Sequence, residues 1–275
     1  YLAAIDFVDR CTEGTRGNQL RIAHTQYDFI LSQLIRTLTL LFEADQRIGG
    51  DAAKSAKMVV FDENMMEELL FGFPNLTDIC PQLCGVFART AVAQHSAPYY
   101  IDKAEEYGIT GDVCTMPKAE LGIAIEDDNP EVGKCMLHCN TSCDTSLMGN
   151  SIEDRRYQKP AFAIAAPHYL EDDLIKEYGA DEVKAAIRFV EEQTGERWDW
   201  DAYFANMRLF NEQTRSFLEI LDLQKTAWPQ VPENNYALHR DVYYTRMMNA
   251  TSAEYLAVDD KIRKLMLKGY ERKEL

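Results

Sequence analysis

GDVCTMPKAELGIAIEDDNPEVGKCMLHCNTSCD, residues 111–144, is the stretch from which the fold follows, and it holds four of the seven cysteines. In its first half, Cys114 ends a short segment that reads as extended and is followed by threonine, methionine and proline. Threonine is a good N-cap, and proline is tolerated in the first turn of a helix. We therefore expect a helix to start directly after Cys114 and to run to Ile125.

The second half of the stretch predicts a buried strand followed by another helix. Residues 134–140 read as the strand, and Cys143 comes after it. Residues with helix-cap chemistry surround this cysteine: Ser142, Asp144, Thr145 and Ser146. We expect the thiols of Cys114 and Cys143 to lie at carboxyl ends of strands and to face the amino ends of helices. Open α/β sheets bind ligands in this crevice, and helix amino ends favour an anionic thiolate–metal centre.

Strands alternate with helices on both sides of this stretch, which predicts an α/β fold with a doubly wound parallel sheet. Residues 57–61 and 161–166 read as short buried strands. Helices are expected over 65–71 and over 101–107, and residues 80–85 are a further candidate strand.

Helical patterns dominate the two ends of the chain. The N-terminal pattern is one apolar stripe at steps of three and four residues, formed by Leu20, Ala23, Tyr27, Ile30, Leu34, Leu38 and Leu41. Gly49 and Gly50 are expected to close this helix. Near the other end, Asp199 is expected to cap a long helix that runs to about Leu223. The expected organisation is a helical segment over 1–57, an α/β domain over 58–170 and a helical segment over 171–275.

Composition and charge exclude several classes of function. The net charge of −16 and the absence of a basic tract argue against binding to nucleic acid or to acidic membranes. No apolar run reaches the ~18 residues of a membrane span, and no signal peptide is evident. An odd number of cysteines, seven, is typical of reduced thiols in a cytoplasm rather than of a secreted disulfide framework.

The spacing of the cysteines limits the metal sites that they can form. Cys135, Cys139 and Cys143 follow one another at intervals of four, which is off by one from radical-type iron–sulfur loops. On a strand, Cys135 and Cys139 lie ~13 Å apart, so one cluster a few ångströms across does not take both. A cluster held by Cys114 and Cys143 is geometrically easy, but it needs further ligands. The pair Cys80 and Cys84 is a possible half-site, although buried inert cysteine is commoner.

Other catalytic motifs are absent or weak. The chain contains no G-x-x-x-x-G-K-[ST], no G-x-G-x-x-G and no G-x-S-x-G, so nucleotide hydrolysis, dinucleotide binding and serine-nucleophile chemistry are unsupported. Glu67 and Glu68 open the helix after the first strand, where complementing the helix dipole is their simplest role. His138 and His168 sit alone in or beside strand ends, which is typical of structural histidines.

Five short motifs occur in a characteristic order between residues 58 and 235. They are Glu67-Glu68-Leu69-Leu70; Ala104-Glu105-Glu106-Tyr107 followed by Asp112-Val113-Cys114 and Lys118-x-x-Leu121-Gly122; Asn140-Thr141-Ser142-Cys143-Asp144; the strand 161–166 with Pro167-His168-Tyr169; and 191–195 followed by Asn211-Glu212. In these motifs the chain resembles the two-subunit 2-hydroxyacyl-CoA dehydratases and the ATP-dependent benzoyl-CoA reductases.

The resemblance implies a flavodoxin-like domain in which Cys114 and Cys143 are ligands of one [4Fe–4S] cluster. Glu68 is similar to the acidic residue near the acyl-CoA pocket of the family. It further implies a homologous second subunit, in a heterodimer or larger assembly, and a separate ATP-hydrolysing activator that delivers an electron. One-electron reduction of a CoA thioester then gives a ketyl radical, in an oxygen-sensitive lyase or oxidoreductase of the cytoplasm.

The chain also departs from the family pattern. No cysteine follows Cys143, so the second α/β domain that supplies a third ligand is expected to be truncated or absent, or Cys84, Cys139 or another group replaces that ligand. The residues after Glu68, Phe71-Gly72-Phe73, replace small ones. Two alternatives stay open: a non-catalytic electron-relay or structural subunit of the same complex, and a zinc-binding or metal-free α/β module. Dehydratases and aromatic-ring reductases are not distinguished by these motifs.

Overall fold

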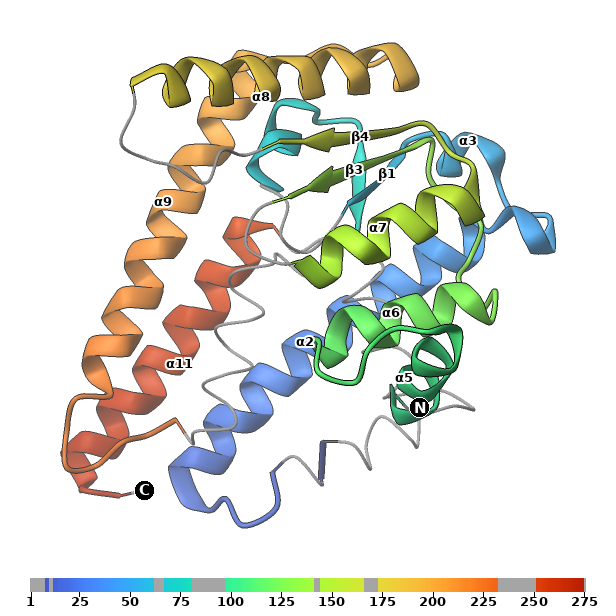
Figure 1. The fold of residues 1–275 in the computed structure, drawn as a ribbon. Helices are drawn as coiled ribbons and strands as arrows, with labels where there is room; N and C mark the ends of the chain where they lie inside the picture. The colour runs from blue at the N-terminus through green and yellow to red at the C-terminus, as the bar shows by residue number, and fades with distance from the viewer. Residues whose placement is uncertain are drawn as a thin grey trace. The chain divides into compact units, whose positions relative to one another are not determined.

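The computed structural model describes residues 8–9, 12–61, 67–80, 97–140, 144–165, 173–231 and 251–274. Its helices and strands, with 3₁₀ helices marked η, are α2 (Gly17–Ala44), η1 (Gln46–Ile48), α3 (Ala52–Ser55), β1 (Met58–Phe61), η2 (Glu67–Gly72), β2 (Thr77–Ile79), α5 (Ala97–Tyr107), α6 (Thr115–Ile125), β3 (Cys135–Cys139), α7 (Asp144–Tyr157), β4 (Ala161–Ile164), α8 (Asp173–Thr194), α9 (Trp200–Leu223) and α11 (Ser252–Arg272) (Figure 1). Residues 81–85 of the candidate strand at 80–85, with Cys84 among them, lie outside the described residues, as do Cys143 and His168.

The chain forms two compact units. One is Thr37–Tyr203, and the other combines Tyr1–Arg36 with Phe204–Leu275. Both boundaries fall inside long helices, α2 and α9. The division at residues 57 and 170 stays a prediction about domains.

The unit of residues 37–203 contains a four-stranded parallel sheet with flanking helices, so the predicted α/β fold is confirmed. The strand order is β2-β1-β3-β4, which matches the first four positions of a flavodoxin-like sheet. Val59 of β1 pairs with Cys135 of β3, and Leu137 of β3 pairs with Phe162 of β4. The order of the strands reverses at β1, because β2 lies on one side of it and β3 and β4 lie on the other. The crevice of the fold is therefore at the carboxyl ends of β1 and β3.

Helices cover both faces of this sheet. His138 of β3 lies 2.8 Å from Asp154 of α7, so α7 packs on the face to which His138 points. Leu137 points to the opposite face. There its register partner Phe162 stacks on Phe189 of α8, with ring centroids 5.6 Å apart.

The strand predicted at 161–166 is present as β4, but it is not fully buried as expected. Ala163 is exposed, and only Ile164 of the four residues is buried. The reason is position: β4, like β2, is an edge strand of the described sheet, whereas β1 and β3 have neighbours on both sides and are buried throughout. An edge position is a property of the strand order and leaves little mark on the local sequence.

The N-terminal stripe forms the buried face of α2. Five of its residues are buried, namely Ala23, Tyr27, Ile30, Leu34 and Leu41. The helix ends at Ala44, so the predicted end at Gly49 and Gly50 is wrong. The Asp45 side chain accepts the N–H of Arg47 at 3.0 Å and starts the separate turn η1. A side chain that bonds to its own backbone competes with the helix, which explains the early stop.

The other unit is helical and has its own core. Its buried apolar residues come from α2, α9, α11 and the segment after α9: Ile22, Ile220, Val231, Ile262 and Met266.

Asp199 caps α9 as predicted, accepting the N–H groups of Asp201 and Ala202 at 2.8 and 3.0 Å. Within the described residues, none of the helices is long and apolar enough to cross a membrane.

Candidate functional site

Cys114 occupies the N-cap position of α6, and the helix predicted after it is confirmed. The helix begins at Thr115 and ends at Ile125. The carbonyl of Cys114 accepts the N–H of Lys118 at 3.4 Å, while its side chain makes no capping hydrogen bond. The thiol is exposed. The reduced thiol of Cys114 is thus accessible at the amino end of α6, where it can coordinate a metal or contact a bound group.

The chain reaches Cys114 from a helix, so the extended segment expected before this residue is wrong. Gly108 follows α5 with φ +114°, and the N–H of Ile109 returns to the carbonyl of Ala104 at 3.1 Å. Turn residues 111–112 then lead toward α6. Glycine tolerates such a φ without steric penalty, so α5 stops abruptly and the chain folds back directly into α6.

α5 and α6 form a closely packed hairpin. A side chain at Gly122 would overlap the backbone of Tyr100 on α5. The side chain of Lys118 is only 1% exposed, and its Nζ lies 2.6 Å from Glu105 Oε1 and 3.1 Å from the Gly111 carbonyl oxygen. The sequence motif contains Lys118 but assigns it no role, because lysine is ordinarily an exposed residue.

α6 and α7 lie side by side and run in the same direction (Figure 1). Their carboxyl ends are joined, since Arg156 Nη2 of α7 donates to the Ile125 carbonyl of α6 at 2.6 Å. Asn129, just after α6, donates to the Tyr157 hydroxyl at 2.6 Å. The helices have 11 and 14 residues, about 16 and 21 Å at ~1.5 Å per residue. Their amino ends therefore lie at the same edge of the unit.

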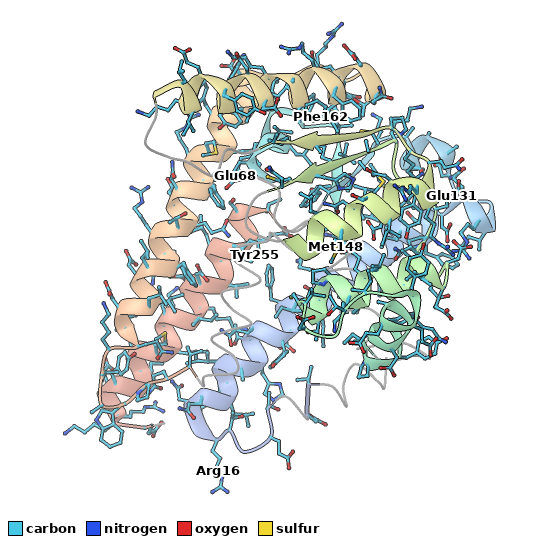
Figure 2. The ribbon with its side chains drawn as sticks, viewed as in Figure 1. Arg16, Glu68, Glu131, Met148, Phe162 and Tyr255 are labelled. Atoms are coloured by element: carbon cyan, nitrogen blue, oxygen red, sulfur yellow. The ribbon has the colours of Figure 1, made fainter. Side chains whose placement is uncertain are left out.

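This edge is the one at which the strands end. α7 connects the parallel strands β3 and β4, so it runs back across the sheet and begins where β3 stops. Glu68 lies on η2, which follows β1, the neighbour of β3. Figure 2 shows Glu68 and Met148, the latter near the start of α7, at the side toward which β3 and β4 point. The fold thus brings η2 and the amino ends of α6 and α7 to the crevice side of the sheet.

Cys143 lies outside the described residues. The next residue in the chain, Asp144, is the first residue of α7. That the Cys143 thiol faces the amino end of α7 stays a prediction. Among the residues that the structure describes, no three side chains of His, Cys, Asp or Glu gather into a metal site.

Cys135 and Cys139 occupy opposite ends of β3, which confirms the strand expected here. Both side chains are buried. Burial raises the pKa of the Cys135 thiol to about 12, so this thiol is protonated at neutral pH. Four steps of ~3.3 Å along the extended chain separate the two by ~13 Å. A single local site that uses both residues does not fit this strand.

His138 anchors α7 to the sheet. The side chain is 4% exposed, and its Nε2 lies 2.8 Å from Asp154 Oδ1. Its Nδ1 finds no hydrogen-bond partner in the described parts of the chain. The contact with Asp154 supports the structural role expected for this histidine.

The sequence model of a protein family described as 2-hydroxyglutaryl-CoA dehydratase, D-component, matches residues 67–270, about three quarters of the chain. The chain belongs to this family. The family resemblance seen in the short motifs is thereby confirmed, and the matched region includes Glu68, Cys114 and Cys143. No curated protein matches the chain.

The match to the 2-hydroxyglutaryl-CoA dehydratase D-component family begins at η2, a 3₁₀ helix where an α-helix was expected. Glu68 is half-buried on it. The carbonyl of Gly72 accepts the N–H of Asp199 at 2.8 Å, and the ring of Phe73 packs edge-on against Trp198 with centroids 5.3 Å apart. A Cβ at Gly72 would run into the Trp198 indole. Gly72, which lies between two phenylalanines, therefore allows η2 to pack closely against the connection between α8 and α9.

Proposed function

We propose that this chain is the [4Fe–4S] subunit of an oxygen-sensitive acyl-CoA enzyme of the 2-hydroxyacyl-CoA dehydratase or benzoyl-CoA reductase type. Cys114 and Cys143 are the cluster ligands in this proposal, and Glu68 is the catalytic residue near the acyl-CoA. One observation carries it: Cys114, whose side chain is exposed and makes no capping hydrogen bond, occupies the N-cap position of α6 beside the parallel helix α7, whose first residue directly follows Cys143.

The residues that are present fit such a cluster. A cluster with thiolate ligands is anionic, and two helix amino ends at one edge offer unpaired N–H groups and partial positive charge. The Cys114 side chain makes no capping hydrogen bond, so its sulfur is available for coordination. Cys135 is not a candidate, because it lies at the amino end of β3, whereas the crevice is at the carboxyl ends of the strands. The remaining ligands come from other groups, for which Cys84, Cys139 and the second subunit are candidates.

When bound, the cluster supplies one electron at very low potential to the thioester carbonyl of the substrate. The residues of this chain hold the cluster, exclude water and place the acyl group, with Glu68 at the carboxyl end of β1. ATP is hydrolysed by a separate activator, which agrees with the absence of a nucleotide-binding loop motif from the sequence. A homologous subunit completes the assembly.

The test is anaerobic reconstitution of the full chain with ferrous iron and sulfide. We expect about four irons per chain, brown charge-transfer absorption and an electron paramagnetic resonance signal after reduction. Cys114→Ser and Cys143→Ser each lose most of the iron. Cys135→Ala, the control at the other end of β3, keeps it.

Two results would contradict the proposal. One is a wild-type protein that binds no iron under these conditions, and the other is full iron content in Cys114→Ser. Zinc bound in place of iron supports the zinc module, and a protein with no metal at all supports the metal-free module.

A further inference from the structure

Lys118 is the only buried lysine or arginine among the described residues. Removing an ammonium group from water is costly unless an opposite charge and hydrogen bonds replace the water. The charge of Lys118 is therefore expected to serve a purpose that an apolar side chain of the same size does not serve.

The contacts of Lys118 converge on the turn that presents Cys114. Its Nζ donates to Glu105 Oε1 on α5 at 2.6 Å and to the Gly111 carbonyl, three residues before Cys114, at 3.1 Å. Its backbone N–H donates to the Cys114 carbonyl at 3.4 Å. Lys118 thus bonds to the turn before α6 through both its side chain and its backbone N–H.

We propose that Lys118 is a positioning residue for the cluster ligand: its ammonium, held by Glu105, fixes the Gly111 carbonyl and so sets the place of the Cys114 thiol. This inference rests on the proposed function. Glu105 is 41% exposed on its outer side, so it holds the ammonium and can itself stay solvated when Lys118 is replaced.

Two variants separate positioning from a simple contribution to stability. Lys118→Met keeps the volume of the side chain and removes a buried charge, so the fold is retained while the Gly111 carbonyl loses its donor. Glu105→Gln does the reverse: the buried ammonium loses its counter-charge and the protein is destabilised, yet Lys118 still donates to Gly111. A matched control is Lys103→Met on α5, because Lys103 pairs with Glu106 at 2.8 Å on the surface.

The experiment measures iron release to a chelator, the spectrum of the reduced cluster and the thermal midpoint of the reconstituted full chain. For Lys118→Met we expect release about tenfold faster and an altered spectrum, with a midpoint within about 3 °C of the wild type. For Glu105→Gln we expect a lower midpoint with wild-type release and spectrum. Lys103→Met changes none of the three. Iron release that follows the thermal midpoint across all variants, or wild-type release in Lys118→Met, overturns the proposal.

A second measurement uses the reduced, metal-free chain and separates this inference from the proposed function. Amide hydrogen exchange at Ile109 and Lys118, whose N–H groups are bonded in the hairpin, is expected to be about tenfold faster in Lys118→Met than in Lys103→Met. If the wild type binds no iron, the proposed function fails, but this measurement still decides whether Lys118 holds the turn. Equal exchange in the two variants shows that it does not.

Discussion

Asp259 and Asp260 are neighbours on α11 with opposite electrostatic surroundings. Asp259 is buried, and the loss of water raises the pKa of its carboxyl to about 7, although the Ser216 hydroxyl and the charge of Arg263 act to lower it. Asp260 is half-buried, and its hydrogen bond from Lys264, at 2.5 Å, lowers its pKa. Between about pH 4 and 7 the folded chain thus keeps a proton on Asp259 that the unfolded chain has released. Stability is therefore lost across this range as the pH rises.

Asp259→Asn should remove this dependence. In urea unfolding followed by circular dichroism, we expect the free energy of unfolding of the wild type to fall by a few kcal/mol between pH 4 and pH 8 because of Asp259. The fall amounts to about 1.4 kcal/mol for each unit by which the pKa of this carboxyl is higher in the folded chain than in the unfolded chain. The fall should be clearly smaller in Asp259→Asn. Asp260→Asn is the control, since its carboxyl is ionised in both states over most of this range. A fall of the same size in all three proteins would show that Asp259 is ionised in the folded chain.

At the scale of elements, the sequence predicts those helices and strands whose positions depend on residues adjacent in the chain. The start of α6 after Cys114 agrees with Pro117 in its first turn, although Thr115 is the first helical residue and not its cap. β3 follows from its apolar run. The expected strand before Cys114 is absent because α5 folds straight back at Gly108, and this geometry depends on how α5 and α6 pack. The burial of Lys118 has the same origin. Tertiary contacts decide each of these features, and local propensity carries little information about them.

Gly72→Ala should disrupt the packing of η2 against Trp198. Overpacking against the Trp198 indole is expected to cost about 1–3 kcal/mol and to shift η2 together with Glu68. Urea unfolding measures the cost, and tryptophan emission reports the displaced indole. The control is Gly149→Ala on α7, where an added Cβ meets no atom within 4 Å and should stabilise by about 0.5–1 kcal/mol. Equal stability of Gly72→Ala and the wild type would argue against close packing here.

At the scale of the whole molecule, the described sheet and the family match both concern the region that bears the proposed site. Glu68, Cys114 and Cys143 belong to the unit of residues 37–203, whereas the family match extends through α11 of the other unit. Local patterns identify the sheet and the family, but they do not reveal that two helices cross the unit boundaries. The remaining ligands of the proposed cluster leave no such pattern in the sequence, because they depend on contacts distant in sequence.

Glu68→Gln tests whether the assembled enzyme uses this chain for chemistry or as an electron relay. With the activator and the second subunit present, we expect turnover to fall at least about 100-fold, as for loss of a group that transfers protons, while iron content and the cluster spectrum stay unchanged. Glu67→Gln is the neighbouring control and should keep most of the activity. Unchanged turnover in Glu68→Gln would favour the relay subunit.

The helical unit is discontinuous in sequence, because the sheet unit is inserted between its two parts. Asn18 donates to the Leu265 carbonyl across a separation of 247 residues. During synthesis, the inserted unit can therefore fold as soon as its own strands have emerged, whereas α2 waits for α11 to leave the ribosome. A premature stop before α11 is expected to leave Ile22 of α2 without its partners Ile262 and Met266 and to yield a chain prone to aggregation.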